Sequence, residues 1–197
     1  MANLSYIMFF ILFFAALYLI FVLYNLYTQL ITKKNKVYEA LGTVDVQLTQ
    51  RHDLIPNILT IAKKFMEHED NIFTKITELR GGANNPYDLK DPAAVAEHLQ
   101  MANALDQQMA QLKIQVENYP TLKSDQTVVQ AMTTYNEVEA NIAAARRFYN
   151  TSVSSLNTSV EIFPGSLIAS IIKIQTMPFY KAEETSKAPV NASDYLE

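Results

Sequence analysis

The sequence predicts an all-α protein, in which an N-terminal transmembrane helix is followed by an elongated antiparallel bundle of three long helices plus a short C-terminal helix. Three observations carry this prediction. An uncharged apolar run opens the 197-residue chain, and apolar residues then recur with a period of about 3.5 residues, as in packed helices. Only four glycines are present, whereas a sheet protein needs many turn residues.

The first predicted element is a membrane-spanning helix over residues 4–24, LSYIMFFILFFAALYLIFVLY. Its length matches the roughly 20 apolar residues that cross about 30 Å of hydrocarbon. Tyr6, Tyr24 and Tyr27 stand near its ends, where aromatic rings favour the headgroup level. A cleaved signal peptide or a buried core helix are the alternatives, but no basic n-region or small-residue cleavage site is present. We therefore expect residues 1–30 to form a transmembrane anchor.

The charges around the span predict its orientation. Lys33, Lys34 and Lys36 follow the span, whereas the residues before it carry no charged side chain. Because positive residues tend to stay inside, we expect the N-terminus outside and the soluble domain in the cytoplasm, with the lipid bilayer of the cytoplasmic membrane around the span.

The first long soluble helix is predicted from residue 37 and is expected to continue directly from the span, because no strong helix breaker lies between them. Eleven of thirteen positions on its seam are apolar, and the two exceptions are charged. The phase of the seam continues past Pro56, so we interpret this proline as a kink and not as an end. The seam comprises Val37, Leu41, Val44, Leu48, Arg51, Ile55, Ile58, Ala62, Phe65, Glu69, Ile72, Ile76 and Leu79.

The second long helix is expected after a loop at residues 81–86, which contains two glycines, two asparagines and a proline. Asp91 can cap this helix and Pro92 suits its first position. Pro120 disfavours helical geometry in the residue before it and so ends the helix. The buried seam is predicted to comprise Val95, Leu99, Ala102, Leu105, Met109, Leu112, Val116 and Tyr119.

The third long helix is expected to be capped by Ser124 or Asp125 and to end at Phe163-Pro164-Gly165. Its seam comprises Val128, Met132, Tyr135, Glu139, Ile142, Arg146, Tyr149, Val153 and Leu156.

A short apolar stretch at residues 166–177 is too short to span a bilayer. We expect it to form a small fourth helix that covers the bundle, which completes a domain of residues 31–178. Residues 179–197 are rich in Glu, Ser, Lys, Ala and Pro. This composition predicts a disordered tail.

Several motifs in residues 24–165 resemble the LemA family. DVQL at residues 45–48 and RHDLIPNI at 51–58 carry most of the resemblance, and the arginine-to-asparagine run is specific. Three further matches follow in the family's order and spacing. They are HE at 68–69, YPTLK at 119–123, and a segment that runs from Glu139 through IA at 142–143 to RRFYN at 146–150. Leu41, where the family usually has tryptophan, and Gln50, where it often has a basic residue, depart from the pattern.

The resemblance implies a bacterial inner-membrane protein with an N-terminal membrane helix, a cytoplasmic helical bundle and no assigned enzymatic activity. Magnetosome-associated relatives take part in building intracellular membranes, and other relatives are encoded beside membrane metalloproteases. These associations set expectations about function and do not establish it.

The side chains that catalysis needs do not form a recognisable motif. The residues three positions before His52, His68 and His98 are not glutamates, so no di-iron motif exists, and neither a zinc-protease motif nor a phosphate-binding loop is present. His68-Glu69-Asp70 could bind a metal weakly, but a polar, solvent-exposed stretch of helix is the better-supported interpretation of these residues. We therefore predict no catalytic residue, no metal, no cofactor and no nucleic-acid partner, hence no enzyme.

Charges on apolar seams are the candidate site residues. Buried charges are costly unless they are paired, so Arg51 is predicted to meet Glu139, and Arg146 to meet Asp53 or Glu69. The favoured interpretation is a structural polar network that fixes helix register, and the alternative is a contact with a polar ligand or partner.

The predicted function is a membrane-anchored scaffold that forms a homo-oligomer or organises other membrane proteins, with membrane remodelling as one outcome. A single anchor and a rigid rod project a surface from the bilayer. The alternative is an adaptor or regulator of a membrane protease or sensor, which would bind its partner at defined stoichiometry.

Overall fold

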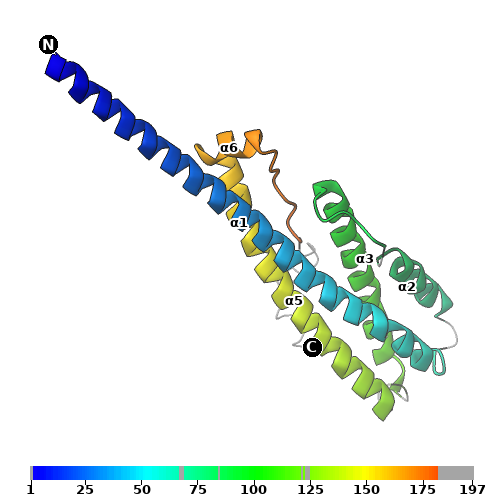
Figure 1. Cartoon of the computed structure of the whole chain (residues 1–197). Coiled ribbons are helices and arrows are strands. Elements are labelled where there is room, and N and C mark those ends of the chain that lie inside the picture. Colours follow the sequence, from blue (N-terminus) through cyan, green and yellow to red (C-terminus); the bar gives the residue numbers. More distant parts are fainter. Residues whose placement is uncertain (1, 67–68, 84, 121, 123–124, 182–197) are drawn as a thin grey trace, which may run out of the picture.

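The computed structural model describes residues 2–66, 69–83, 85–120, 122 and 125–181, and every regular element in these ranges is a helix. The elements are α1 (Ala2–Ala62), α2 (Asp70–Ala83), α3 (Pro92–Glu117), α5 (Gln126–Glu161) and α6 (Gly165–Ile171). Figure 1 shows a bundle from which the N-terminal half of α1 projects alone. The all-α fold with one long apolar N-terminal helix is confirmed.

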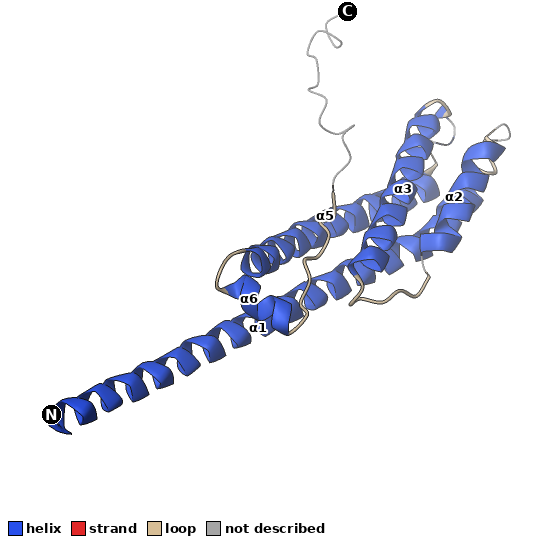
Figure 2. Ribbon diagram, turned by 90° about the horizontal axis from the view of Figure 1, so that it is seen from above, coloured by secondary structure: helices blue, strands red, loops and turns tan. Residues whose placement is uncertain are grey.

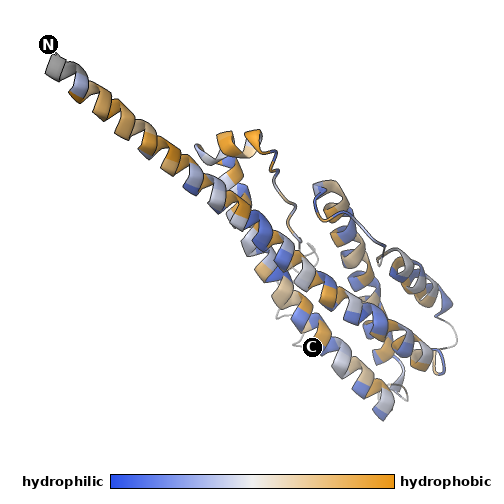
Figure 3. Ribbon diagram, in the orientation of Figure 1, coloured by the Kyte–Doolittle hydropathy of each residue, from blue (hydrophilic) through white to orange (hydrophobic). Residues whose placement is uncertain are grey.

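Helix α1 is one element of 61 residues that joins the apolar segment to the bundle. Its first part is apolar on all sides, as the colouring in Figure 3 shows. None of its most apolar stretch is buried, although its length and composition suffice to cross a membrane. A helical segment that is apolar all round, and that is not buried by any other part of the described ranges, suits a lipid environment.

The bundle consists of two antiparallel helix pairs. Helices α1 and α5 lie side by side, and α2 packs against α3 (Figures 1 and 2). One apolar cluster includes Val44, Leu99 and Tyr149, and the other includes Ile55, Leu112 and Val128. Each cluster draws side chains from α1, α3 and α5, so these three helices share a continuous interior.

The N-caps of two helices agree with the sequence analysis. The Asp91 carboxylate accepts a hydrogen bond from the backbone N–H of Ala93, with Pro92 at the first helical position. Asp125 accepts hydrogen bonds from the backbone N–H groups of Thr127 and Val128 and so caps α5. These bonds satisfy donors that a helix start otherwise leaves free.

The first soluble helix is shorter than predicted. We expected its seam to reach Leu79, but α1 passes through Pro56 and ends at Ala62. The chain then forms a separate α2, whose Phe73 and Ile76 are buried against the second cluster. The periodicity could not reveal this break, because the apolar positions stay buried after the chain turns and no glycine or proline marks the turn.

A second difference concerns the expected loop at residues 81–86, because α2 continues through Gly81 and Gly82 to Ala83. A Cβ atom on Gly82 would lie 3.0 Å from Met101 Cε. This Met101 atom is the end of a flexible side chain that can move by a few tenths of an ångström, so the close approach of α2 to α3 does not itself require glycine at this position.

The C-terminal segment 172–180, here called the strap, lies along α5 and extends the bundle beyond residue 178. Asn157 exchanges two hydrogen bonds of 2.9 Å with the backbone of Met177, and Asn150 makes the same pair with Tyr180 at 2.8 and 2.9 Å. Tyr180 is fully buried. The rest of the expected disordered tail, residues 182–197, lies outside the described residues.

Helix α6 lies at the end of the bundle nearest the projecting part of α1 (Figure 1). It packs against α1 and α5, with Ile168 and Ala169 against Leu30. A Cβ atom on Gly165 would collide with the Ser159 carbonyl oxygen. Only glycine fits this position, because the chain reverses tightly between α5 and α6.

Candidate functional site

A group of charged side chains crosses the bundle between the two apolar clusters, and we call it the polar layer. It comprises Arg51 on α1, Asp106 on α3, and Glu139 and Arg146 on α5. Its neighbours along α1 are Leu48 of the first cluster and Ile55 of the second. The polar layer therefore places a buried charge, Arg51, at the boundary between the two apolar clusters.

Arg51 and Asp106 are central to the polar layer. The Arg51 side chain is 1% exposed and pairs with Asp106. Its Nη1 lies 3.4 Å from Glu139 Oε1, and its Nη2 donates a 3.1 Å hydrogen bond to the Ala102 carbonyl oxygen. Asp106 also accepts a 3.2 Å hydrogen bond from Arg146 Nη2. One carboxylate thus joins arginines from two helices, which links α1, α3 and α5.

The charges of the polar layer balance, with two guanidinium groups and two carboxylates. A buried arginine without partners would carry a large desolvation cost, and these carboxylates offset it. The guanidinium of Arg146 also lies 4.1 Å from the ring centre of Tyr180, a cation–π contact that connects the strap to the layer. Burial, and then the charge of Glu139, raises the pKa of the neighbouring Tyr135.

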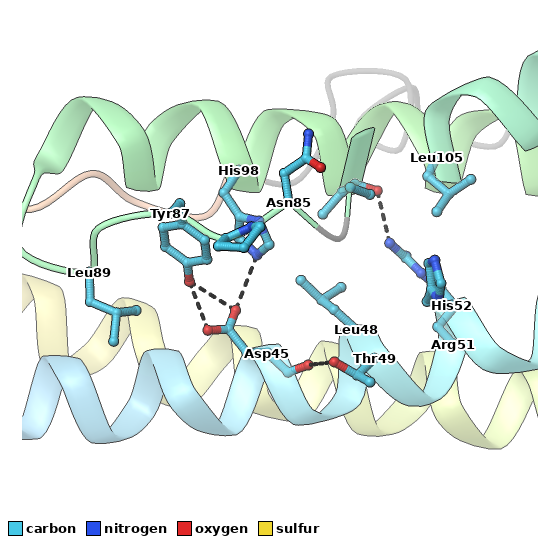
Figure 4. Close-up of a pocket in the computed structure, with 13 residues that line it drawn as sticks. Asp45, Leu48, Thr49, Arg51, His52, Asn85, Tyr87, Leu89, His98 and Leu105 are labelled. Atoms are coloured by element: carbon cyan, nitrogen blue, oxygen red, sulfur yellow. Dashed lines mark hydrogen bonds and ion pairs between the residues drawn. The ribbon is translucent and has the colours of Figure 1, made fainter. Parts of the chain in front are cut away.

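A second polar cluster, Asp45, Tyr87 and His98, joins α1, α3 and the loop before α3 (Figure 4). The Tyr87 hydroxyl donates to the Asp45 carboxylate, with oxygen distances of 2.9 and 2.8 Å, and His98 Nε2 lies 3.1 Å from Asp45 Oδ1. The Tyr87 and His98 rings stack with their centres 4.1 Å apart. Burial, and then the hydrogen bond to Asp45, raises the pKa of Tyr87, so its hydroxyl stays a donor.

These groups line a cavity of about 300 Å³, together with Arg51, Ala102 and Leu105. Both oxygens of Asp45 contact Tyr87, and one also contacts His98. The hydrogen bonds of this carboxylate therefore attach the loop before α3 to α1. No group of three or more His, Cys, Asp or Glu residues in the described ranges is placed to hold a metal ion. The arrangement holds three elements together, and its geometry assigns no reaction to the cavity.

The structure places the predicted site residues in different environments. Arg51 and Glu139 are near each other, whereas Arg146 pairs with Asp106 and not with Asp53 or Glu69. The Asp53 side chain is 72% exposed and lies beside His52, because it stands two positions from Arg51 and so faces away from the seam. Glu69 lies outside α1, since that helix ends at Ala62. His68 lies outside the described residues.

Four residues of the two polar groups were missed by the sequence analysis: Asp45, Tyr87, His98 and Asp106. Asp106 adjoins the seam residue Leu105 and stands four positions after the seam residue Ala102. An acidic residue beside a buried seam can reach a charge on a neighbouring helix, and this position was the one sequence signal for Asp106. Asp45 and Tyr87 are 42 residues apart, and no local pattern connects them.

Comparison with known proteins gives concordant matches. The model of the LemA family matches residues 40–193. Protein LemA from Metamycoplasma hominis is 23% identical over 189 residues, which cover 96% of this chain and 83% of the relative. The magnetosome proteins MamQ 1 and MamQ 2 from Paramagnetospirillum magneticum are each 31% identical over 88 residues, or 45% of this chain and 31% of each relative.

Proposed function

Because this chain belongs to the LemA family, we propose that it is a membrane-anchored helical scaffold that associates with itself or with other membrane proteins and organises the bilayer around it. The continuity of α1 is the observation that carries the proposal, since one helix includes both the exposed apolar segment and a bundle-forming segment. No flexible linker separates the two, so the bundle is held at a defined position relative to the span.

The cytoplasmic membrane of a bacterial cell is the proposed location, with the N-terminus outside and the bundle in the cytoplasm. The support for this orientation is the group of lysines at positions 33, 34 and 36, directly after the span. The match to the magnetosome proteins, over 88 residues, supports a membrane-associated helical protein. We propose no catalytic activity for the bundle.

The proposal is tested by the mass of the full-length protein. We expect a homo-oligomer in mild detergent, measured by light scattering, and crosslinks between copies in native membranes. The chain has no cysteine, so single cysteines at Leu17 in the span and at Val129 on α5 can locate the contact. A protein that is strictly monomeric in detergent and in lipid, with no co-isolated partner, would contradict the scaffold.

The same crosslinking experiment identifies the alternative function. A monomer that crosslinks at defined stoichiometry to one other membrane protein would support an adaptor or regulator and not a self-associating scaffold. Arg146→Met separates the two interpretations of the polar layer. A folded bundle that keeps its partners supports a role in helix register, whereas a folded bundle that loses its partner indicates a contact role.

A further inference from the structure

Helix α6 lies at the level where the apolar span ends. Ile168 and Ala169 pack with Leu26 and Leu30 of α1. These leucines follow Tyr24, the end of the span, by two and six residues, or about 3 and 9 Å along the helix axis. The polar interface of a bilayer is roughly 5–7 Å thick on each side. An upright α1 therefore holds α6 within or directly beside the headgroup region.

The other face of α6 and the turn before it expose large apolar side chains. Ile162, Phe163, Leu167 and Ile171 are 60%, 77%, 55% and 72% exposed. Phe163 and Ile171 are more exposed than Tyr18, which at 70% is the most exposed of the large apolar residues described in the span. Figure 3 shows this apolar helix beside α1, at the end of the bundle toward the span. Exposed apolar surface of this kind marks a contact site.

Lysines lie just beyond this apolar group. Lys33 donates a hydrogen bond to Ser159 near the end of α5, and Lys34 and Lys173 line one cavity with Ile172 of the residues after α6. An apolar face followed by lysines is the pattern of a helix that lies in the membrane interface, because the ammonium groups can reach lipid phosphates.

We propose that α6 and the preceding turn form a second membrane contact, in which Phe163, Leu167 and Ile171 insert into the leaflet that faces the bundle. This inference rests on the proposed anchoring of α1 in the bilayer. The lipid surface is the occupant because α6 packs on Leu26 and Leu30, directly after the span, so its exposed apolar face meets the interface as soon as α1 stands in the membrane. Gly165 permits the tight return that brings α6 to this level.

The contact fixes the bundle on the membrane at two points. The span alone leaves the bundle free to rotate about the axis of α1. A second contact beside that axis prevents this rotation, so one defined face of the bundle meets the lipid.

The absence of tryptophan makes a direct test possible. Single-tryptophan variants Phe163→Trp, Leu167→Trp, Phe13→Trp and Ile114→Trp of the full-length protein are placed in phosphatidylcholine vesicles, in separate preparations with bromine on the acyl chains near the headgroup or near the bilayer centre. Phe13 lies near the middle of the span, so bromine near the bilayer centre should quench its replacement, which serves as the positive control. Ile114 is 64% exposed on α3, away from the span, and serves as the matched exposed control.

We expect bromine near the headgroup to quench the tryptophan fluorescence of Phe163→Trp and Leu167→Trp by at least about half as much as bromine near the bilayer centre quenches that of Phe13→Trp. The fluorescence of Ile114→Trp should not change in either preparation. Quenching of Phe13→Trp without quenching at positions 163 and 167 would overturn the inference and leave the anchoring intact. An unquenched Phe13→Trp would overturn both. Blue-shifted but unquenched emission at 163 and 167 would assign the surface to a protein contact, which also overturns the inference.

Discussion

At the residue scale, the polar layer depends on how many partners each charge has. Asp106 contacts two arginines from two helices, whereas Glu139 lies 3.4 Å from one of them and is 31% exposed. Arg51 is almost fully buried, so its charge carries a larger desolvation cost than the partly exposed carboxylates, and this cost must be offset by the ion pairs. The two acidic residues are therefore expected to contribute unequally to stability.

Asp106→Asn and Glu139→Gln test this inequality with matched, nearly isosteric changes. We expect Asp106→Asn to lower the free energy of unfolding by about 2–4 kcal/mol, because it leaves two arginines short of a counter-charge. Glu139→Gln should cost less than about 1 kcal/mol, as for a partly exposed pair. Urea unfolding followed by circular dichroism measures both values. Equal losses would show that Asp106 is not the central residue of the layer.

Tyrosines in the bundle predict a loss of stability at high pH. Burial is the largest cause of the raised pKa values of Tyr87, Tyr135 and Tyr149. The unfolded chain ionises its tyrosines near the ordinary value of about 10, while the folded chain keeps these protons, so stability is fully present below about pH 10 and falls above it.

Urea unfolding midpoints at about pH 8 and about pH 11 measure this loss. Tyr135→Phe should show a smaller decrease between the two pH values than the unmodified protein, because it removes one titrating group. Tyr6→Phe in the exposed N-terminal part of α1 is the control. An identical decrease in Tyr135→Phe and the unmodified protein would contradict the assignment.

At the element scale, the strap depends on two asparagines seven residues apart on α5. Each amide side chain both donates to and accepts from one strap residue, Met177 or Tyr180, so the strap backbone is paired as it would be by a neighbouring strand. Tyr149 adds a 2.8 Å hydrogen bond from its hydroxyl to the Pro178 carbonyl oxygen. These contacts explain why Tyr180 is buried against the polar layer.

Asn150→Ala is expected to release the end of the strap. The loss of two partly buried hydrogen bonds should cost about 1–3 kcal/mol and speed amide hydrogen exchange at Tyr180. Thr151→Ala is the matched control, because the Thr151 hydroxyl donates within α5, to the Arg147 carbonyl oxygen, and makes no hydrogen bond to the described part of the strap. Unchanged exchange at Tyr180 in Asn150→Ala would show that the strap is held by its apolar contacts alone.

The helices could be predicted from sequence because their apolar period and their caps are local. Asp91 and Asp125 identify two helix starts by residue type and position alone. The end of α1 at Ala62 could not be predicted, since Phe73 and Ile76 satisfy the apolar period equally well in a separate helix. Arg51 and Glu139 were found because they are charges on apolar seams. Asp106 required knowledge of which helices meet.

At the scale of the whole molecule, the proposed anchoring of α1 places the end of the bundle far from α6 away from the bilayer. From Tyr24 to Ala62, α1 adds about 57 Å of helix beyond the span. Helices α3 and α5 lie along this part of α1 (Figures 1 and 2). The surface of α2 and α3 is thus presented at a distance from the lipid headgroups, where a second copy or another protein can reach it.

A height measurement tests this arrangement in the cysteine-free chain. A fluorophore on Thr60→Cys should lie about 54 Å from the level of Tyr24, and one on Asn35→Cys about 16 Å, by helix rise. Energy transfer to acceptor lipids in vesicles should therefore be weak from position 60 and strong from position 35. Strong transfer from both positions would show that the bundle lies flat on the membrane.

The uninterrupted path of α1 from the span into the bundle has a mechanical consequence. A span changes its tilt when the hydrophobic thickness of the bilayer changes. A hinge after the span would absorb such a change, but α1 is helical through this point and transmits it. Over about 57 Å, a change of roughly 10° moves the far end of the bundle sideways by roughly 10 Å. In the proposed membrane arrangement, a change in membrane thickness is thereby converted into a lateral displacement of the bundle, as by a lever.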